Sequence, residues 1–164
     1  EMTSSLVGSE MCIRDSKYNQ INEIMREIRY RGIGIAERKW VFGSLWFDTR
    51  NKATLIWSEE LKYWVRVDPA TVGQYTGLKD EHGKEIYEGD VIRSPLSEDK
   101  TRPHRIFYHT GNAAFMGALV DRKELCYLRL DQDWIYKFGK EVIGNIHDNP
   151  ELIEKQTAER HKTN

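Results

Sequence analysis

The sequence predicts an all-β protein, a barrel or roll of short antiparallel strands with a short C-terminal helix. Two observations support this fold class. Short apolar or alternating segments recur along the chain, and turn signals separate them about every ten residues. Internal repeats, heptads and low-complexity tracts are absent from the sequence. With 164 residues, the chain is long enough to bury one hydrophobic core, so we expect a single domain.

The first predicted strand is "REIRYRGIGI". Its side chains alternate, so that Ile28 and Tyr30 share one face while Arg29 and Arg31 share the other. Past Gly32 the apolar positions change phase, which predicts a β-bulge at this glycine. Further strands are predicted at 39–47, 53–58, 61–67, 105–109, 113–120, 125–130, 134–138 and 141–147, with another that begins at Val91 and Ile92.

The connections follow from turn residues. Residues 94–105 are polar, contain two prolines and lack periodicity, so we predict a loop there. The segment "TGN" predicts a hairpin turn before residue 113, and "GK" predicts a tight turn before residue 141. At the C-terminal end, Asn149 fits an N-cap and Pro150 fits the first helical position. We expect this helix to fray, or the chain to be disordered, over 155–164.

The N-terminal residues indicate a segment that is not part of the natural protein. The peptide "MCIRDS", residues 11–16, can be back-translated into the transposon end sequence of short-read DNA libraries. We therefore interpret residues 1–16 as translated adaptor and 1–24 as a non-native or disordered segment, with Met25 as the natural start. The alternative is a genuine disordered extension. The β domain is then expected over 25–154.

Composition narrows the function classes. The formal net charge is −1, so no global charge draws the chain toward nucleic acid or acidic membranes. No run of about 18 apolar residues exists, and we expect no membrane association. The two cysteines, Cys12 and Cys126, form no metal-binding motif, and we expect a reduced, cytoplasmic protein without a cofactor or metal. Cys126 has apolar neighbours, which favours a buried, inert thiol.

The segment "TGLKDEHGKEIYEGDVI", residues 76–92, contains five carboxylates but not the spacing of an EF-hand loop. Turn chemistry explains it better. Asp80 and Gly83 fit the first and fourth positions of a type I turn, Gly89 fits a second turn, and Asp90 stands at the entrance of a strand. We therefore predict structural roles for these four residues and inward packing for Ile86 and Tyr87.

Five residues are candidates for binding. Alternation places Trp64 on the polar face of its strand together with Lys62 and Arg66, which predicts an exposed aromatic contact. Arg29 and Arg31 belong to a basic stretch near the start of the domain. Basic residues between aromatic residues are typical of proteins that bind single-stranded nucleic acid. The alternatives are core packing for most tryptophans and an ordinary solvated surface for the basic residues. The basic residues fall into two groups, Arg26, Arg29, Arg31, Arg38 and Lys39 in the first and Lys100, Arg102, His104 and Arg105 in the second.

Catalysis is the alternative reading. The alternative hypothesis is a site in which His104, His109 and His147 converge with Asp90 or Asp148, as in a hydrolase. The motifs HExxH, GxSxG, GxGxxG and the Walker loop are all absent from the sequence. We therefore predict no catalytic residues. A structural component of a virion is a third possibility, although no heptads indicate self-assembly.

Three segments in order resemble one family. "VDPATVGQYTGLKDEHGKEIYEGDVI" is similar to the central signature of the YopX family, "MREIRYRG" with "KWVFGSL" resembles its N-terminal end, and "EVIGNIHDNPEL" resembles its C-terminal end. The resemblance implies phage or prophage origin and an all-β fold with SH3-like barrel character, and it brings no catalytic residues. We expect a cytoplasmic accessory protein that binds an unknown phage or host protein, with single-stranded nucleic acid as the alternative partner. The sequence leaves the oligomeric state open.

Overall fold

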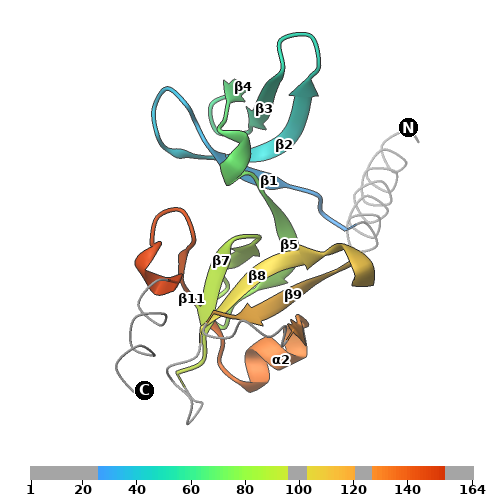
Figure 1. Ribbon diagram of the computed structural model, residues 1–164, viewed down its shortest axis with the longest axis vertical. Helices are drawn as coiled ribbons and strands as arrows, with labels where there is room; N and C mark the ends of the chain where they lie inside the picture. The colour runs from blue at the N-terminus through green and yellow to red at the C-terminus, as the bar shows by residue number, and fades with distance from the viewer. Residues whose placement is uncertain (1–25, 96–102, 121–126, 154–164) are drawn as a thin grey trace, which may run out of the picture.

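The computed structural model describes residues 26–95, 103–120 and 127–153, and almost all of its regular structure is β-strand. Two antiparallel sheets have the strand orders β4-β3-β2-β1-β5-β6 and β10-β9-β8-β7-β11 (Figure 1). The all-β prediction is confirmed. The strands are β1 (Tyr30–Ile33), β2 (Trp40–Asp48), β3 (Ala53–Ser58), β4 (Tyr63–Arg66), β5 (Gly73–Lys79), β6 (Glu85–Tyr87), β7 (Asp90–Arg93), β8 (His104–His109), β9 (Ala114–Leu119), β10 (Tyr127–Arg129) and β11 (Glu141–Asn145).

Strands β1 to β4 form an N-terminal lobe, residues 26–72, with a small core of its own. Val41, Ile56 and Val67 are its buried centre. The sheet curls, because a single bridge joins Gly34 to Val67 and so brings the ends of β1 and β4 together. The sheet stays open apart from this bridge. The described strands thus form two open sheets in place of the single barrel that we expected. The short 3₁₀ helix η1 (Pro69–Thr71) follows β4.

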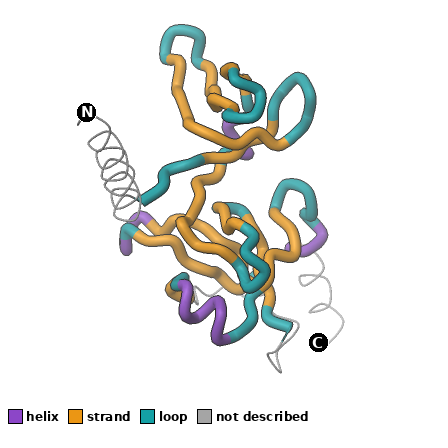
Figure 2. The backbone as a smooth tube through the Cα atoms, turned by 180° about the vertical axis from the view of Figure 1, so that it is seen from behind, coloured by secondary structure: helices purple, strands orange, loops and turns teal. Residues whose placement is uncertain are grey.

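Strands β5 to β11 form a C-terminal lobe, residues 73–153, around a second core. Ile86, Ile92, Ile106 and Phe115 are central to this core, and Ile135 reaches it from helix α2 (Gln132–Lys137). The predicted hairpin is present as β8, the 3₁₀ helix η2 (Thr110–Asn112) and β9. Figure 2 shows from behind that strands and loops make up most of the backbone and that the helical segments are short.

Strand β5 connects the two lobes. It pairs with β1 through Tyr30 and Arg31 on one side and with β6 on the other. The predicted inward packing of Ile86 and Tyr87 is confirmed, since they are 0% and 2% exposed. The 76–92 segment therefore lies where the first sheet passes from one lobe into the other.

Three local predictions were wrong. Residues 134–138 are largely the helix α2, because the Asp131 carboxylate caps it by accepting a hydrogen bond from the Trp134 backbone at 2.7 Å. Their aromatic and β-branched character had favoured a strand. The strand predicted at 105–109 is present as β8, but it begins one residue earlier, at His104, because His104 pairs with Leu119 and Ile92. The predicted loop is therefore shorter, and its residues 96–102 lie outside the described residues.

The bulge predicted at Gly32 is absent. Strand β1 pairs with β2 in uninterrupted register, with Gly32 opposite Val41. A Cβ atom at this position would lie 3.2 Å from Ile56 and Val67, so the glycine allows close packing against the small core. The change of phase in the sequence instead reflects the buried side chain of Arg31, which is 7% exposed.

The ends of the chain are described only in part. Residues 151–153 are helical after Asn149 and Pro150, as the capping residues predict. Both cysteines and the segments 1–24 and 155–164 lie outside the described residues. Among the helices that the structure describes, none has the length and apolar character needed to cross a membrane.

Candidate binding surface

The register of β2, β3 and β4 gathers aromatic side chains on one face of the N-terminal lobe. Trp57 is opposite Trp64, Leu55 is opposite Arg66, and Trp46 is opposite Leu55 on the next strand. Because residues directly opposite in an antiparallel pair project to the same side, these five side chains share one face. The other face of the same strands carries the small core.

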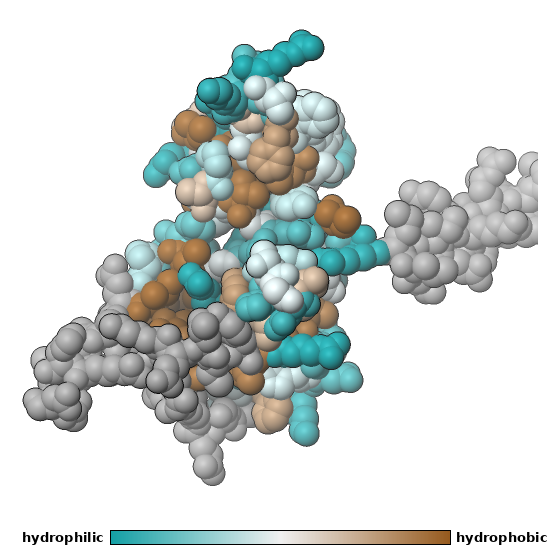
Figure 3. All heavy atoms as spheres, turned by 45° about the vertical axis from the view of Figure 1, so that its right-hand side comes forward, coloured by the Kyte–Doolittle hydropathy of each residue, from teal (hydrophilic) through white to brown (hydrophobic). Residues whose placement is uncertain are grey.

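Three of these residues, Trp46, Trp57 and Trp64, make a continuous surface that we call the tryptophan face. The rings of Trp57 and Trp64 are 5.6 Å apart at 65°, and those of Trp46 and Trp64 are 6.3 Å apart at 57°. Such tilted arrangements are favourable between aromatic rings. Trp46 is 57% exposed and Trp64 is 45% exposed, so the packed rings remain open to solvent. In Figure 3, hydrophobic and hydrophilic residues are interspersed over the N-terminal lobe.

Two of the predicted basic residues lie beside this face. Arg66 is exposed at the end of β4, across the strand pair from Leu55. Lys62 is in the turn before β4, where its Nζ lies 3.3 Å from Glu59 Oε2. The sequence analysis thus identified Trp64, Lys62 and Arg66 in one area. It missed Trp46 and Trp57, because only the register between strands reveals them.

The two other predicted binding residues lie elsewhere. Arg29 forms ion pairs with Glu27 and Glu85, and its guanidinium lies 5.3 Å from the ring centre of Tyr75. Arg31 is buried between the lobes. Its Nη2 donates to Asp90 Oδ1 at 2.6 Å and to the Glu88 carbonyl at 3.1 Å. Both guanidiniums are occupied by contacts that join the lobes.

The surroundings of Arg31 define the seam between the lobes. Its guanidinium is 4.7 Å from the ring centre of Trp40 and 4.9 Å from that of Tyr87. Asp90 also accepts a hydrogen bond from the Tyr87 backbone at 2.8 Å. Burial raises the pKa of Asp90, and the positive charge of Arg31 opposes this rise. Trp40 completes the seam by donating from Nε1 to Asp148 at 2.7 Å.

The segment around Asp80 has the geometry of a turn. The Gly83 backbone donates to the Asp80 carbonyl at 3.0 Å, and Gly83 and Gly89 have φ angles of +81° and +83°. The Asp80 carboxylate accepts from the backbones of His82 and Lys84 at 2.9 and 2.8 Å and from Val142 at 3.1 Å. Asp80 is 2% exposed, and its buried carboxylate is satisfied by hydrogen bonds from backbone N–H groups of the turn and of β11.

The same turn brings possible metal ligands together. Glu81, His82 and Glu141 each offer a ligand atom, and these atoms lie within 4.8 Å of one another. The sequence analysis predicted no metal site in this segment, because the EF-hand spacing is absent, and it did not connect Glu141 with the turn. Arg93 holds one Glu141 oxygen at 3.0 Å, and His82 Nε2 lies 3.5 Å from Glu81 and 3.8 Å from Glu141. The ion pair with Arg93 orients the Glu141 carboxylate toward the other two side chains.

The histidines considered for catalysis lie in different parts of the fold. His104 is buried on β8, with its ring 6.0 Å from that of Trp134. His109 caps η2 by accepting from the Asn112 backbone at 3.1 Å. His147 lies at the seam with its ring 6.0 Å from that of Trp40. Asp90 and Asp148 are engaged by Arg31 and Trp40 as described above, and among the three histidines it is His147 that the described contacts place beside them, at the seam.

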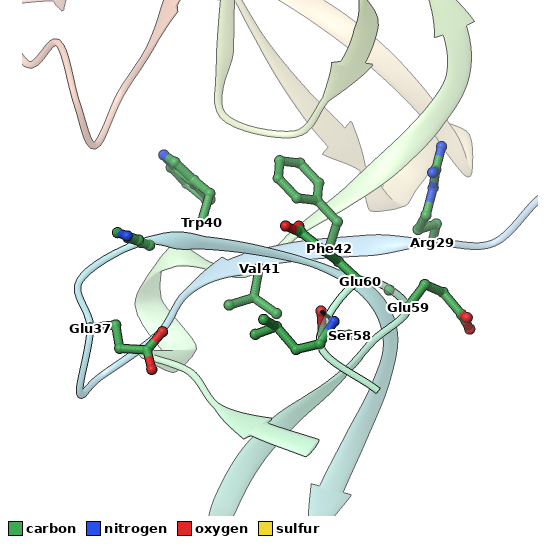
Figure 4. A pocket seen from close by; sticks show the side chains of 11 residues that line it. Arg29, Glu37, Trp40, Val41, Phe42, Ser58, Glu59 and Glu60 are labelled. Atoms are coloured by element: carbon green, nitrogen blue, oxygen red, sulfur yellow. Dashed lines mark hydrogen bonds between the residues drawn. The ribbon is translucent and has the colours of Figure 1, made fainter. Parts of the chain in front are cut away.

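A cavity of about 320 Å³ opens beside β2 and the β3–β4 turn. Figure 4 shows Trp40 and Phe42 on one side of β2 and Val41 on the other. Charged residues of both signs line the cavity, including Lys39, Glu37 and Glu60. This mixture favours no particular class of small ligand.

Fold and surface define an all-β protein of two small lobes that presents an aromatic face to solvent. Residues 18–154 match the YopX protein family, and the chain belongs to this family. The match begins ahead of Met25. The crystal structure of protein EF1440 from Enterococcus faecalis is similar in fold, with a TM-score of 0.52 and 25% sequence identity. The similarity covers 79% of this chain and 99% of that one. No curated protein matches the sequence.

Proposed function

We propose that the protein acts by binding a macromolecular partner on the tryptophan face, as a cytoplasmic accessory protein of a phage or prophage. The observation that carries this proposal is the exposure of Trp46 and Trp64, 57% and 45%, within one packed aromatic cluster. Tryptophan is enriched among residues that dominate binding energy, and contiguous exposed apolar surface is typical of interaction sites. The exposed guanidinium of Arg66 adds a hydrogen-bond donor at the edge of this surface.

Single-stranded nucleic acid is a second candidate partner. Successive bases stack on aromatic side chains, and each stacked base contributes about 1–3 kcal/mol by alanine substitution. The ring arrangement of Trp46, Trp57 and Trp64 with Arg66 nearby suits this mode. The exposed acidic residues Glu59 and Glu60 at the next turn weaken the attraction for phosphate groups. We therefore propose a protein as the main partner and single-stranded nucleic acid as the alternative.

The test compares variants on one strand. Trp46→Ala removes an exposed ring from the tryptophan face, whereas Phe47→Ala removes a ring that is 63% exposed on the opposite face of β2. Affinity capture from phage-induced host cells is quantified for wild type and both variants, with and without nuclease. We expect Trp46→Ala, and likewise Trp64→Ala, to lose the partner while Phe47→Ala retains it. Equal capture by all variants would contradict the proposal.

The nuclease arm separates the two candidate partners. Loss of capture after nuclease treatment indicates nucleic acid, and retention indicates protein. For nucleic acid, binding of a labelled oligothymidine in low salt should weaken about fivefold or more in Trp64→Ala, which follows from a loss of about 1 kcal/mol or more per stacked base. The affinity should also fall steeply as salt is raised.

A further inference from the structure

The turn at residues 80–84 and strand β11 bring three possible metal ligands together in the C-terminal lobe. Glu81 and His82 belong to the turn, and Glu141 is the first residue of β11. Their ligand atoms all lie within 4.8 Å of one another. His82 Nε2 is 3.5 Å from Glu81 Oε1 and 3.8 Å from Glu141 Oε2. Two separate elements thus present one nitrogen and two oxygens to the same small volume.

The separations between these atoms are close to those around a bound ion. Zinc ligands lie about 2.0–2.2 Å from the metal in a tetrahedral arrangement, which places two ligand atoms about 3.4 Å apart. The two distances from the imidazole nitrogen already approach this value. The side chain of His82 is 68% exposed and those of Glu81 and Glu141 are each 25% exposed, so rotation of the side chains can close the remaining difference.

The backbone that carries these ligands is held by the buried carboxylate of Asp80. Its Oδ1 accepts a hydrogen bond from the His82 backbone at 2.9 Å. Its Oδ2 accepts from the backbone of Val142, the neighbour of Glu141, at 3.1 Å. One side chain therefore fixes the turn and β11 against each other. A site whose ligands are already positioned loses less conformational freedom when the ion binds.

A second contact orients the ligand from β11. The register of β7 and β11 places Arg93 opposite Glu141, and Arg93 Nη2 donates to Glu141 Oε1 at 3.0 Å. The guanidinium thus occupies one carboxylate oxygen, while the other, Oε2, faces His82. Carboxylates that bind metals are usually held by an outer hydrogen bond of this kind. Both the position and the orientation of the Glu141 carboxylate are therefore set by contacts outside the three ligands.

We propose that Glu81, His82 and Glu141 form a binding site for a divalent transition-metal ion, with Zn²⁺ as the representative ion. One imidazole nitrogen with two carboxylate oxygens suits such ions, whereas Mg²⁺ and Ca²⁺ prefer ligands that are all oxygen. Three protein ligands leave a fourth position for water. The bound ion links the 80–84 turn to β11, and the tryptophan face, on the other lobe, takes no part in binding it.

The test titrates Zn²⁺ into the full-length chain by isothermal titration calorimetry, after a chelator has removed bound metal. We expect His82→Gln and Glu141→Gln to bind Zn²⁺ about tenfold or more weakly than wild type, since even the loss of an outer hydrogen-bond partner costs about 10–100-fold in metal affinity. Glu60→Gln is the matched control, because it removes an exposed carboxylate from the other lobe. Its affinity should equal that of wild type.

Thermal unfolding gives a second readout of the same site. An ion that binds the folded state stabilises it, so Zn²⁺ should raise the midpoint of unfolding of wild type more than that of His82→Gln. The His82 side chain is exposed, and glutamine keeps the backbone bond to Asp80, so we expect this variant to fold. Mg²⁺ at the same concentration should neither shift the midpoint of wild type nor displace Zn²⁺, because it binds imidazole poorly.

Three outcomes overturn the proposal. One is the absence of Zn²⁺ binding to wild type in the calorimeter. Another is equal affinity in wild type, His82→Gln and Glu141→Gln, because the ion then binds elsewhere in the chain. The third is displacement of Zn²⁺ by an equal concentration of Mg²⁺, because the imidazole is then not a ligand.

Discussion

Arg31 is the residue that most directly joins the two lobes. It comes from β1, yet its ionic partner Asp90 begins β7, and its guanidinium lies between Trp40 and Tyr87. The side chains of Arg31 and Asp90 are only 9% and 2% exposed. Removing one partner of such a pair leaves a buried charge without compensation, whereas removing both need not be destabilising.

We therefore expect Arg31→Ala to lower the free energy of unfolding by about 3–5 kcal/mol. Urea titration followed by tryptophan fluorescence measures this value. The double variant Arg31→Met with Asp90→Asn should recover much of the loss, because neither charge remains and the asparagine oxygen can still accept from the Tyr87 backbone. Arg29→Ala is the control, since Arg29 is more exposed and should cost about 1 kcal/mol or less. An equal cost for Arg31→Ala and Arg29→Ala would contradict this role.

Among the elements, α2 shows where sequence patterns compete. The residues "WIYKF", 134–138, are typical of a strand. They are nevertheless largely helical, because the Asp131 side chain caps the helix by accepting a hydrogen bond from the Trp134 backbone. Helix α2 is short, so intrinsic propensity contributes little to it. Capping and the burial of Ile135 in the C-terminal core therefore stabilise the element.

Asp131→Ala should lower the free energy of unfolding by about 1 kcal/mol, the usual value of a lost N-cap. Asp133→Ala is the matched control in the same turn. It removes an acidic residue without removing the capping bond, so its effect should be smaller, about 0.3–1 kcal/mol. The midpoint of thermal unfolding compares the two variants with wild type. A larger shift for Asp133→Ala would mean that charge, and not capping, positions this helix.

The sequence predicted what depends on local order. Alternation located β4 and the exposed face of Trp64 and Arg66, and turn chemistry located the Asp80–Gly83 turn and the β8–β9 hairpin. It failed where distant residues decide. The bulge at Gly32 was predicted from the change of phase of the apolar positions, whereas Arg31 is buried there because it pairs with Asp90. Trp46 and Trp57 join Trp64 only through strand register.

At the scale of the whole molecule, two small cores share one seam. Trp40, in the N-terminal lobe, donates a hydrogen bond to Asp148, which lies near the other end of the described chain. The ring of His147 lies 6.0 Å from the ring of Trp40. Because the N-terminal core is small, much of the stability of its lobe must come from contact with the other lobe. A change in charge at the seam should therefore affect the unfolding of the whole chain.

His147 makes the seam sensitive to pH. Burial lowers its pKa from the usual 6.5, the positive charge of Arg31 lowers it further, and Asp148 and Asp68 oppose the change. The folded protein thus favours neutral His147, whereas the unfolded chain takes up the proton near its usual pKa. Since the unfolded state binds more protons in this window, the free energy of unfolding rises with pH. The contribution is complete above about pH 6.5 and is lost as the pH falls toward the lowered value.

The variant His147→Gln cannot take up a proton and isolates this contribution. Urea titrations of wild type and variant at about pH 7.5 and about pH 5.5 give two differences in unfolding free energy, and the other titrating groups cancel between the proteins. Wild type should lose stability relative to the variant at the lower pH. A difference independent of pH would show that His147 titrates alike in both states. A difference of the opposite sign would mean that the protonated ring finds a partner at the seam, with Asp148 the adjacent carboxylate, and that the lobes close more firmly in acid.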